Sequence, residues 1–79
     1  MNRKWIEKDE KLFREFKFGN FVEAMIFVNK VAKAAEESNH HPDIEINYNV
    51  VKLFIFTHSA RKITGKDFNL AEKIDEIIR

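Results

Sequence analysis

The first part of the chain alternates between apolar and polar residues with the two-residue period of a β-strand. One parity holds Leu12, Phe16 and Phe18 together with Arg14, and the other holds Phe13 with Glu15 and Lys17. The segment Lys-Asp-Glu-Lys at 8–11 is a polar turn, which joins this strand to a short strand around Trp5 and Ile6. The pattern therefore predicts a hairpin over residues 4–18 with one wetter face.

A helical period follows the Gly19-Asn20 break. Asn20 is a candidate N-cap, and Glu23 three residues later completes a capping box. One apolar stripe at spacings of three, four and seven is formed by Phe21, Ala24, Met25, Val28, Val31, Ala32 and Ala35. Asn39 suits a left-handed C-cap, and Pro42 prevents the helix from continuing. We expect a helix from about residue 21 to 38.

The next segment predicts a second hairpin. Apolar Ile44, Ile46 and Tyr48 alternate with Glu45, Asn47 and Asn49. Residues 50–56 are apolar at both parities apart from Lys52, so this strand should be covered on both faces, with a second subunit as the natural cover. A capping box at Thr64 and Asp67 opens a final helix, which packs through Leu70, Ala71, Ile74, Ile77 and Ile78.

The element order is therefore β-β-α-β-β-α. We expect an α+β fold in two layers, a four-stranded antiparallel sheet with two helices on one face, as a single domain over residues 1–79. A chain this short without cysteine has no disulfides to stabilise it, and self-association is the simplest remaining means.

Composition narrows the class of protein. Fourteen Lys and Arg against 13 Asp and Glu leave a net charge of +1, which favours neither nucleic acid nor an anionic membrane as a partner. The absence of cysteine excludes thiolate metal sites and a cysteine nucleophile. No apolar run approaches the length of a membrane span, and the first residues lack the apolar stretch of a signal peptide, so we expect a cytoplasmic protein.

All three histidines fall near the open end of the second hairpin. With a turn centred on Tyr48-Asn49, paired residue numbers sum to about 97, which places His58 opposite Asn39. Facing strands lie about 4.8 Å apart, so the side chains of His40 or His41 and of His58 are expected to meet over one pocket.

Three interpretations of this cluster stay open from the residues alone. The His-His-Pro segment is also typical of a polar helix exit. Three imidazoles can hold Zn²⁺, although adjacent histidines point in different directions unless the loop bends sharply. Imidazole also suits a reaction that protonates one atom and deprotonates another, because its ordinary pKa of about 6.5 lies near neutral pH. The chain lacks a nucleophile elbow and a dinucleotide glycine fingerprint.

The succession Glu36, His40-His41-Pro42, Tyr48, Thr57-His58-Ser59 and Asp67 resembles the signature of the pterin-4a-carbinolamine dehydratases. The flanking segments Phe16-x-Phe18-x-x-Phe21 and Asp67-Phe68-x-Leu70-Ala71 fit the family as well, and the resemblance covers residues 5–78. It implies an enzyme, a carbon–oxygen lyase that dehydrates 4a-hydroxytetrahydrobiopterin or a related 4a-hydroxytetrahydropterin to a quinonoid dihydropterin and water. It implies neither a metal nor an organic cofactor.

The same resemblance implies the site residues. His40 and His58 would act as general acids toward the 4a-hydroxyl, and His41 would hold the pterin and assist deprotonation at N5. Substrate binding would fall to Glu36, Asn39, His41, Pro42, Thr57 and Asp67. Glu36 is also expected to orient a histidine, and Asp67 also suits a helix-start carboxylate.

Partners and departures follow from the same family. Members form dimers and tetramers through their sheets, so we expect a homodimer or homotetramer that binds a small pterin and no nucleic acid directly. Many members carry a further helix before the position of Trp5, which we expect this chain to lack, and Gly-Gly-Leu where this chain has Arg61-Lys62-Ile63. Two rival functions stay open: a protein-interaction module that acts as a dimerisation cofactor of a homeodomain transcription factor, and a dehydratase in another pterin pathway such as molybdopterin metabolism.

Overall fold

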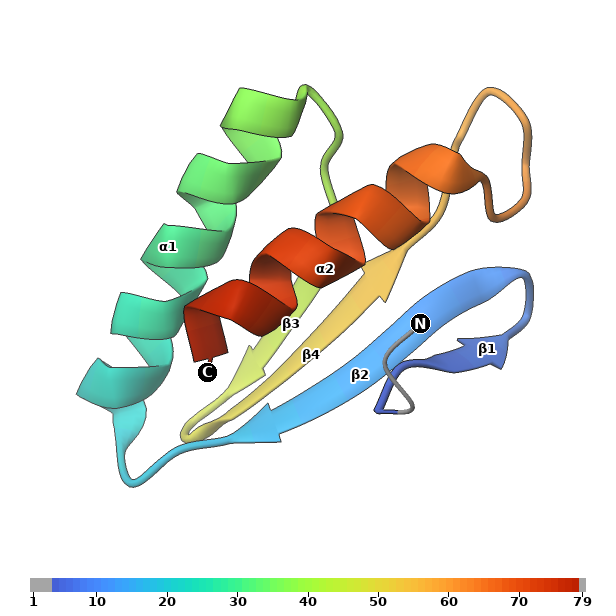
Figure 1. Cartoon of the computed structure of the whole chain (residues 1–79). Coiled ribbons are helices and arrows are strands. Elements are labelled where there is room, and N and C mark those ends of the chain that lie inside the picture. Colours follow the sequence, from blue (N-terminus) through green and yellow to red (C-terminus); the bar gives the residue numbers. More distant parts are fainter. Residues whose placement is uncertain (1–3, 79) are drawn as a thin grey trace.

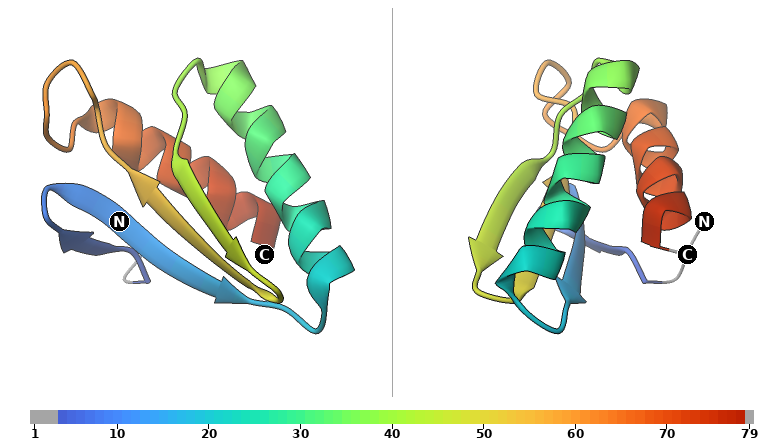
Figure 2. Two further views of the ribbon diagram at one scale, coloured as in Figure 1. Left: turned by 180° about the vertical axis from the view of Figure 1, so that it is seen from behind. Right: turned by 90° about the vertical axis from the view of Figure 1, so that its left-hand side faces the viewer.

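The computed structural model describes residues 4–78, which form one antiparallel sheet and two helices (Figure 1). The strands are β1 (Ile6–Lys8), β2 (Lys11–Lys17), β3 (Asp43–Asn47) and β4 (Val50–Ile55), and the helices are α1 (Phe21–Ser38) and α2 (Gly65–Ile78). Both helices cover the same face of the sheet (Figure 2). The predicted order β-β-α-β-β-α and the α+β fold are confirmed.

The strands lie in the order β1-β2-β4-β3, so the two hairpins meet at the central pair β2 and β4. Asn47 pairs with Val50, and the other pairs between β3 and β4 have the same sum of residue numbers, which confirms the predicted register. The β1–β2 turn lies at Asp9-Glu10, where both residues have positive φ, 51° and 59°. This is the backbone of the tight turns that match the twist of paired strands. The short first strand, predicted around Trp5 and Ile6, spans Ile6–Lys8.

The ends of α1 follow from local hydrogen bonds. The Asn20 side chain accepts from the Glu23 backbone N–H at 2.9 Å, as predicted. The Glu23 carboxylate accepts from the backbone N–H of Gly19, one residue before the position that the capping box predicted. Asn39 has φ 51° and ψ 39°, and its N–H donates to the carbonyls of Ala35 and Glu36. Its left-handed conformation therefore ends the helix.

The hydrophobic core lies between the helices and the inner face of the sheet. It includes the fully buried side chains of Leu12, Val31, Val51, Leu53, Ile55, Leu70 and Ile74. The apolar stripe predicted for α1 was partly wrong, because Phe21 and Ala32 are exposed while Phe27 and Ala34 are buried. Phe27 packs against the rings of Phe16 and Phe18, and α1 contacts α2 as well as the sheet. Ile78, predicted to pack, is 38% exposed.

A buried ion pair fastens the end of α2 to the sheet. Arg14 lies on the inner face of β2, where its Nη1 donates to Asp75 Oδ1 at 2.6 Å. The same oxygen accepts from the indole Nε1 of Trp5 at 2.8 Å. Asp75 therefore joins three segments that are distant in sequence. Arg14 shares the inward-facing parity of β2 with apolar residues, and its ion pair with Asp75 explains how a charged side chain can be buried there.

Within residues 4–78 both helices lie on the inner face of the sheet, and no helix or strand covers the outer face (Figure 2). This outer face carries apolar side chains. The rings of Phe13 and Phe54 lie 5.0 Å apart on neighbouring strands, and Ile6 is 56% exposed. Phe56, predicted as the last residue of the strand, lies just beyond β4. Within residues 4–78 neither helix has the length and apolar composition needed to cross a membrane.

Candidate functional site

The candidate residues lie at one end of the sheet. The segment that precedes β3 and the segment that follows β4 leave the sheet at the same end, because the two strands are antiparallel. The start of α2 lies beside them at the top of Figure 1. The fold therefore brings together residues 39–42, 57–62 and 64–67, although they are separated in sequence.

Asp67 is the centre of the first group of contacts. Its side chain is fully buried, and its Oδ1 lies 2.5 Å from Nε2 of His40, whose side chain is 12% exposed. The other oxygen, Oδ2, accepts from the Thr57 hydroxyl at 2.9 Å and from the Thr64 backbone N–H at 2.7 Å. The predicted role of Asp67 at the helix start is thus confirmed, because its bond to Thr64 N–H is that of a capping box. The same carboxylate also contacts a predicted catalytic histidine.

His41 and Glu36 form a second, more exposed pair. Nε2 of His41 lies 2.5 Å from Oε2 of Glu36, in the last turns of α1. The side chains are 56% and 77% exposed. The expectation that Glu36 orients a histidine stays a prediction, and this contact is consistent with it. Because solvent reaches both groups, the pair adds little to the stability of the fold.

His58 has a different environment from the other two histidines. Its ring packs against the ring of Phe56 at a centroid distance of 4.2 Å. The ammonium group of Lys11 lies 4.8 Å from the centroid of the same phenyl ring. His58 is exposed. It has the same parity as Phe54 and Phe56, whose side chains alternate with the buried side chains of β4. A common pocket for all three histidines stays a prediction.

The loop that carries His58 is closed by backbone hydrogen bonds. Thr57 N–H donates to the Lys62 carbonyl at 3.0 Å, and Arg61 N–H donates to the Thr57 carbonyl at 2.7 Å. Arg61 has φ 54°, a left-handed conformation that favours glycine. Arg61 stands where the family pattern has the first glycine of Gly-Gly-Leu, and its backbone conformation is one that glycine adopts most easily.

The remaining predicted binding residues have plain structural positions. Asn39 is the exposed C-cap of α1, and Pro42 is half-buried between the histidines and β3. The backbone groups of Thr57 are engaged in the loop, and its hydroxyl in the Asp67 contact. Thr64 was predicted as a cap and missed as part of the site. The signal was available, because a capping box whose acid is also a signature residue places its cap beside that site.

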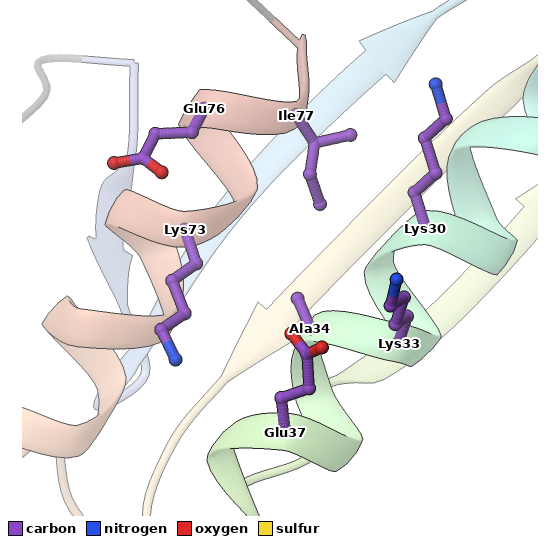
Figure 3. A pocket seen from close by; sticks show the side chains of 7 residues that line it. All are labelled: Lys30, Lys33, Ala34, Glu37, Lys73, Glu76 and Ile77. Carbon is purple, nitrogen blue, oxygen red and sulfur yellow. The ribbon is translucent and has the colours of Figure 1, made fainter.

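Two open grooves run between the helices. One, of about 410 Å³, is lined by His40 and Ser38 at the end of α1 and by polar side chains of α2 that include Lys66 and Asn69. The second, of about 480 Å³, lies farther along the same helix pair (Figure 3). Lys73 and Glu76 line both grooves. His40 is thus reached from the helix side of the domain.

No group of three or more histidine, aspartate or glutamate side chains within residues 4–78 is arranged to hold a metal ion. The contacts described instead pair two imidazoles, each with a different carboxylate. Such pairs are arrangements that orient an imidazole and support proton transfer on a small molecule. The fold and site therefore define a small α+β protein with two imidazole–carboxylate pairs at one end of its sheet.

Comparison with known proteins identifies the family. The family model described as "Pterin 4 alpha carbinolamine dehydratase" matches residues 1–77. The chain therefore belongs to the pterin-4a-carbinolamine dehydratase family, as the sequence signature indicated. A protein of Picosynechococcus sp., provisionally named pterin-4-alpha-carbinolamine dehydratase, is 51% identical over 92% of this chain and 79% of its own length. One of Sulfolobus acidocaldarius with the same provisional name is 47% identical over 92% and 80%.

Solved structures give the same result for the fold. The crystal structure of a transcriptional coactivator/pterin dehydratase from Brucella melitensis superposes with a TM-score of 0.89 at 35% identity, covering 95% of this chain and 82% of that one. A pterin dehydratase-like protein, described as a RuBisCO assembly factor in the alpha-carboxysome, has a TM-score of 0.75 at 22% identity, covering 92% and 84%. At that identity the likeness shows the fold alone.

Proposed function

We propose that this protein is a dehydratase, a carbon–oxygen lyase that converts a 4a-hydroxytetrahydropterin to the quinonoid dihydropterin and water. The observation that carries the proposal is the contact of His40 with Asp67. Two signature residues, 27 positions apart, form one hydrogen bond at a partly buried site. Family membership and this contact together favour acid–base chemistry on a pterin.

The reaction needs two proton transfers and no redox step. The C4a–O bond breaks as the hydroxyl receives a proton and departs as water. The electron pair of the N5–H bond forms the C4a=N5 double bond, and the N5 proton passes to a base. One proton enters and one leaves, so the sum is loss of water alone. A positioned acid or base accelerates such a transfer by about 10²–10⁴-fold.

The roles follow from the family signature, and the carboxylate contacts of His40 and His41 support the roles of these two residues. His40 and His58 donate a proton to the 4a-hydroxyl, each for one stereoisomer. His41 holds the pterin and accepts the proton from N5. Its exposed pair with Glu36 supports this role, because a carboxylate stabilises the imidazolium that forms. Asn39 and Pro42 shape the binding loop between the two histidine pairs.

The test measures 4a-hydroxypterin dehydration by the purified protein, as the rate above the spontaneous reaction. We expect His40→Ala to lower kcat by about 10²-fold or more. Glu36→Ala should raise KM and lower kcat, whereas Glu37→Ala, an exposed neighbour on the same turn, should change neither. A folded wild-type protein without activity, or His40→Ala with the wild-type rate, would overturn the proposal.

A second candidate function is a protein-interaction module. Exposed apolar side chains at the start of α1 favour it: Val22 is 66% exposed, Ile26 51% and Phe21 48%. The Brucella melitensis neighbour is described as a transcriptional coactivator as well as a dehydratase. Val22→Lys with Ile26→Lys should abolish such binding and leave dehydration intact. The opposite result, with loss of activity in a folded protein, would contradict this division of surfaces.

We also infer that copies of this chain associate through the outer face of the sheet. The half-buried Phe13–Phe54 pair and the exposed Ile6 support this inference, because apolar side chains on an open sheet face favour a cover. Phe54→Lys should shift the sedimenting species toward the monomer. A wild-type protein that sediments as a monomer at all concentrations would contradict it.

A further inference from the structure

We propose that Thr57 and Thr64 are positioning residues, which act through Asp67 to hold His40 in the tautomer protonated on Nε2. This inference rests on the proposed function, and it adds which ring nitrogen meets the substrate. The four side chains of Thr64, Thr57, Asp67 and His40 form one hydrogen-bonded relay at the start of α2.

The direction of the relay is set by Asp67, because a carboxylate only accepts. Oδ2 of Asp67 lies 2.9 Å from the Thr57 hydroxyl and 3.5 Å from the Thr64 hydroxyl, so Thr57 is the better donor to it. The two hydroxyl oxygens lie 2.7 Å apart, and the single proton of Thr57 is already used, so Thr64 donates to Thr57. Thr64 in turn accepts from the backbone N–H of Lys66 at 3.3 Å.

The position of the carboxylate follows from these contacts. Oδ2 of Asp67 accepts from the Thr57 hydroxyl at 2.9 Å. The same oxygen accepts from the Thr64 backbone N–H. With two donors already on Oδ2, the carboxylate is fixed in one rotation and presents Oδ1 to His40. A carboxylate only accepts, so the neutral imidazole must donate from Nε2.

The other ring nitrogen is then the reactive one. Within residues 4–78 the ring of His40 makes one hydrogen bond, from Nε2 to Asp67. No buried polar side-chain atom in the same part of the chain lacks a hydrogen-bond partner. Nδ1 of His40 is therefore the nitrogen that solvent reaches. It can accept a proton as the neutral ring, or donate one as the imidazolium that Asp67 stabilises. The relay thus selects the atom that exchanges a proton with the pterin.

The experiment reads the tautomer directly. Long-range ¹H–¹⁵N spectra of the uniformly labelled full chain, at a pH where imidazoles are neutral, distinguish protonated from bare ring nitrogens. The three histidines are assigned with His41→Gln and His58→Gln. We expect wild-type His40 to be protonated on Nε2 alone. Thr57→Val should give a mixture of tautomers, and Thr57→Ser, which keeps the hydroxyl, should restore the single form.

Further variants keep the test decisive if Thr57→Val does not fold. Thr64→Val should loosen the tautomer in the same direction, with Thr64→Ser as its rescue. Ala60→Ser, at an exposed position of the loop after Thr57 and outside the signature, should leave the spectrum and the kinetics unchanged. In the dehydratase assay the two valine variants should lose about tenfold in kcat with little change in KM, the factor expected for one hydrogen bond.

Each outcome separates the two proposals. A wild-type His40 protonated on Nδ1, or an unchanged tautomer in both folded valine variants, would overturn the relay. A single Nε2-protonated tautomer in a wild-type protein that lacks dehydratase activity would refute the function and leave the relay in place. Loss of activity in Thr57→Ser equal to that in Thr57→Val would also contradict the relay, because serine supplies the same donor.

Discussion

Arg61→Gly should stabilise this protein, although it removes a charged side chain and adds a flexible residue. Arg61 has φ 54°, in the left-handed region where a Cβ atom crowds the following carbonyl. The conformation is imposed by the closed loop, because Arg61 N–H donates to the Thr57 carbonyl at 2.7 Å. The exposed side chain of Arg61 forms no hydrogen bond or ion pair with residues 4–78 that this change would remove.

The size of the effect follows from two opposing quantities. A non-glycine residue in the left-handed region costs about 1–2 kcal/mol. Glycine is more flexible in the unfolded chain, which returns about 0.4–1 kcal/mol of that gain. Taken near the middle of both ranges, the net gain in the free energy of unfolding is about 0.5–1 kcal/mol. For a domain of 79 residues this raises Tm by about 2–8 °C.

The assay is urea and thermal unfolding with matched variants. Arg61→Ala removes the same side chain and keeps the strained backbone, so it should change stability little. Lys62→Gly adds the same flexibility at the next residue, whose φ is not positive, and it should lower the free energy of unfolding by about 0.5–1 kcal/mol. Arg61→Asn should lie between alanine and glycine. If Arg61→Gly is no more stable than Arg61→Ala, backbone strain is not what distinguishes this loop.

Three further predictions concern the scaffold. Asp75→Ala should lower the free energy of unfolding by about 3 kcal/mol, because it leaves buried Arg14 without its partner; denaturant unfolding followed by Trp5 fluorescence measures this, and a loss below about 1 kcal/mol would contradict it. Leu53→Ala, at a fully buried position, should cost about 2–5 kcal/mol in the same experiment, and a neutral result would place Leu53 outside the core. Asn20→Ala should cost about 1 kcal/mol while Asn20→Asp retains the cap, and equal stabilities of the two variants would refute the capping role.

Local patterns were sufficient for the order and register of the elements. The second hairpin follows from strict alternation on one strand and from a turn of two residues, since a slip by one residue would turn Ile44 and Leu53 out of the core. The caps at Asn20, Asn39 and Thr64 are likewise read from the chain, because each satisfies backbone groups within a few residues. The resemblance to the family lies in the signature residues and their spacing, which can also be read from the chain.

Tertiary packing decided what local spacing leaves open. The buried face of α1 includes Phe27, which packs against Phe16 and Phe18. It also includes Ala34, which lines the groove between the two helices. No period within one helix records where such neighbours lie. The alternation of apolar and polar residues predicts that Arg14 faces inward. It does not reveal why, because the partner Asp75 is 61 residues away. The relay from Thr64 to His40 likewise needed the fold.

The sequence by itself determined the element order, the strand register, the caps and the signature residues, because these depend on neighbours along the chain. The structure decided that His40 contacts Asp67, that His41 contacts Glu36, and that His58 packs against Phe56. The physical reason is that a side chain chooses its hydrogen-bond partner by distance and direction in space. These depend on how the loops leave the sheet, which no spacing of residues specifies.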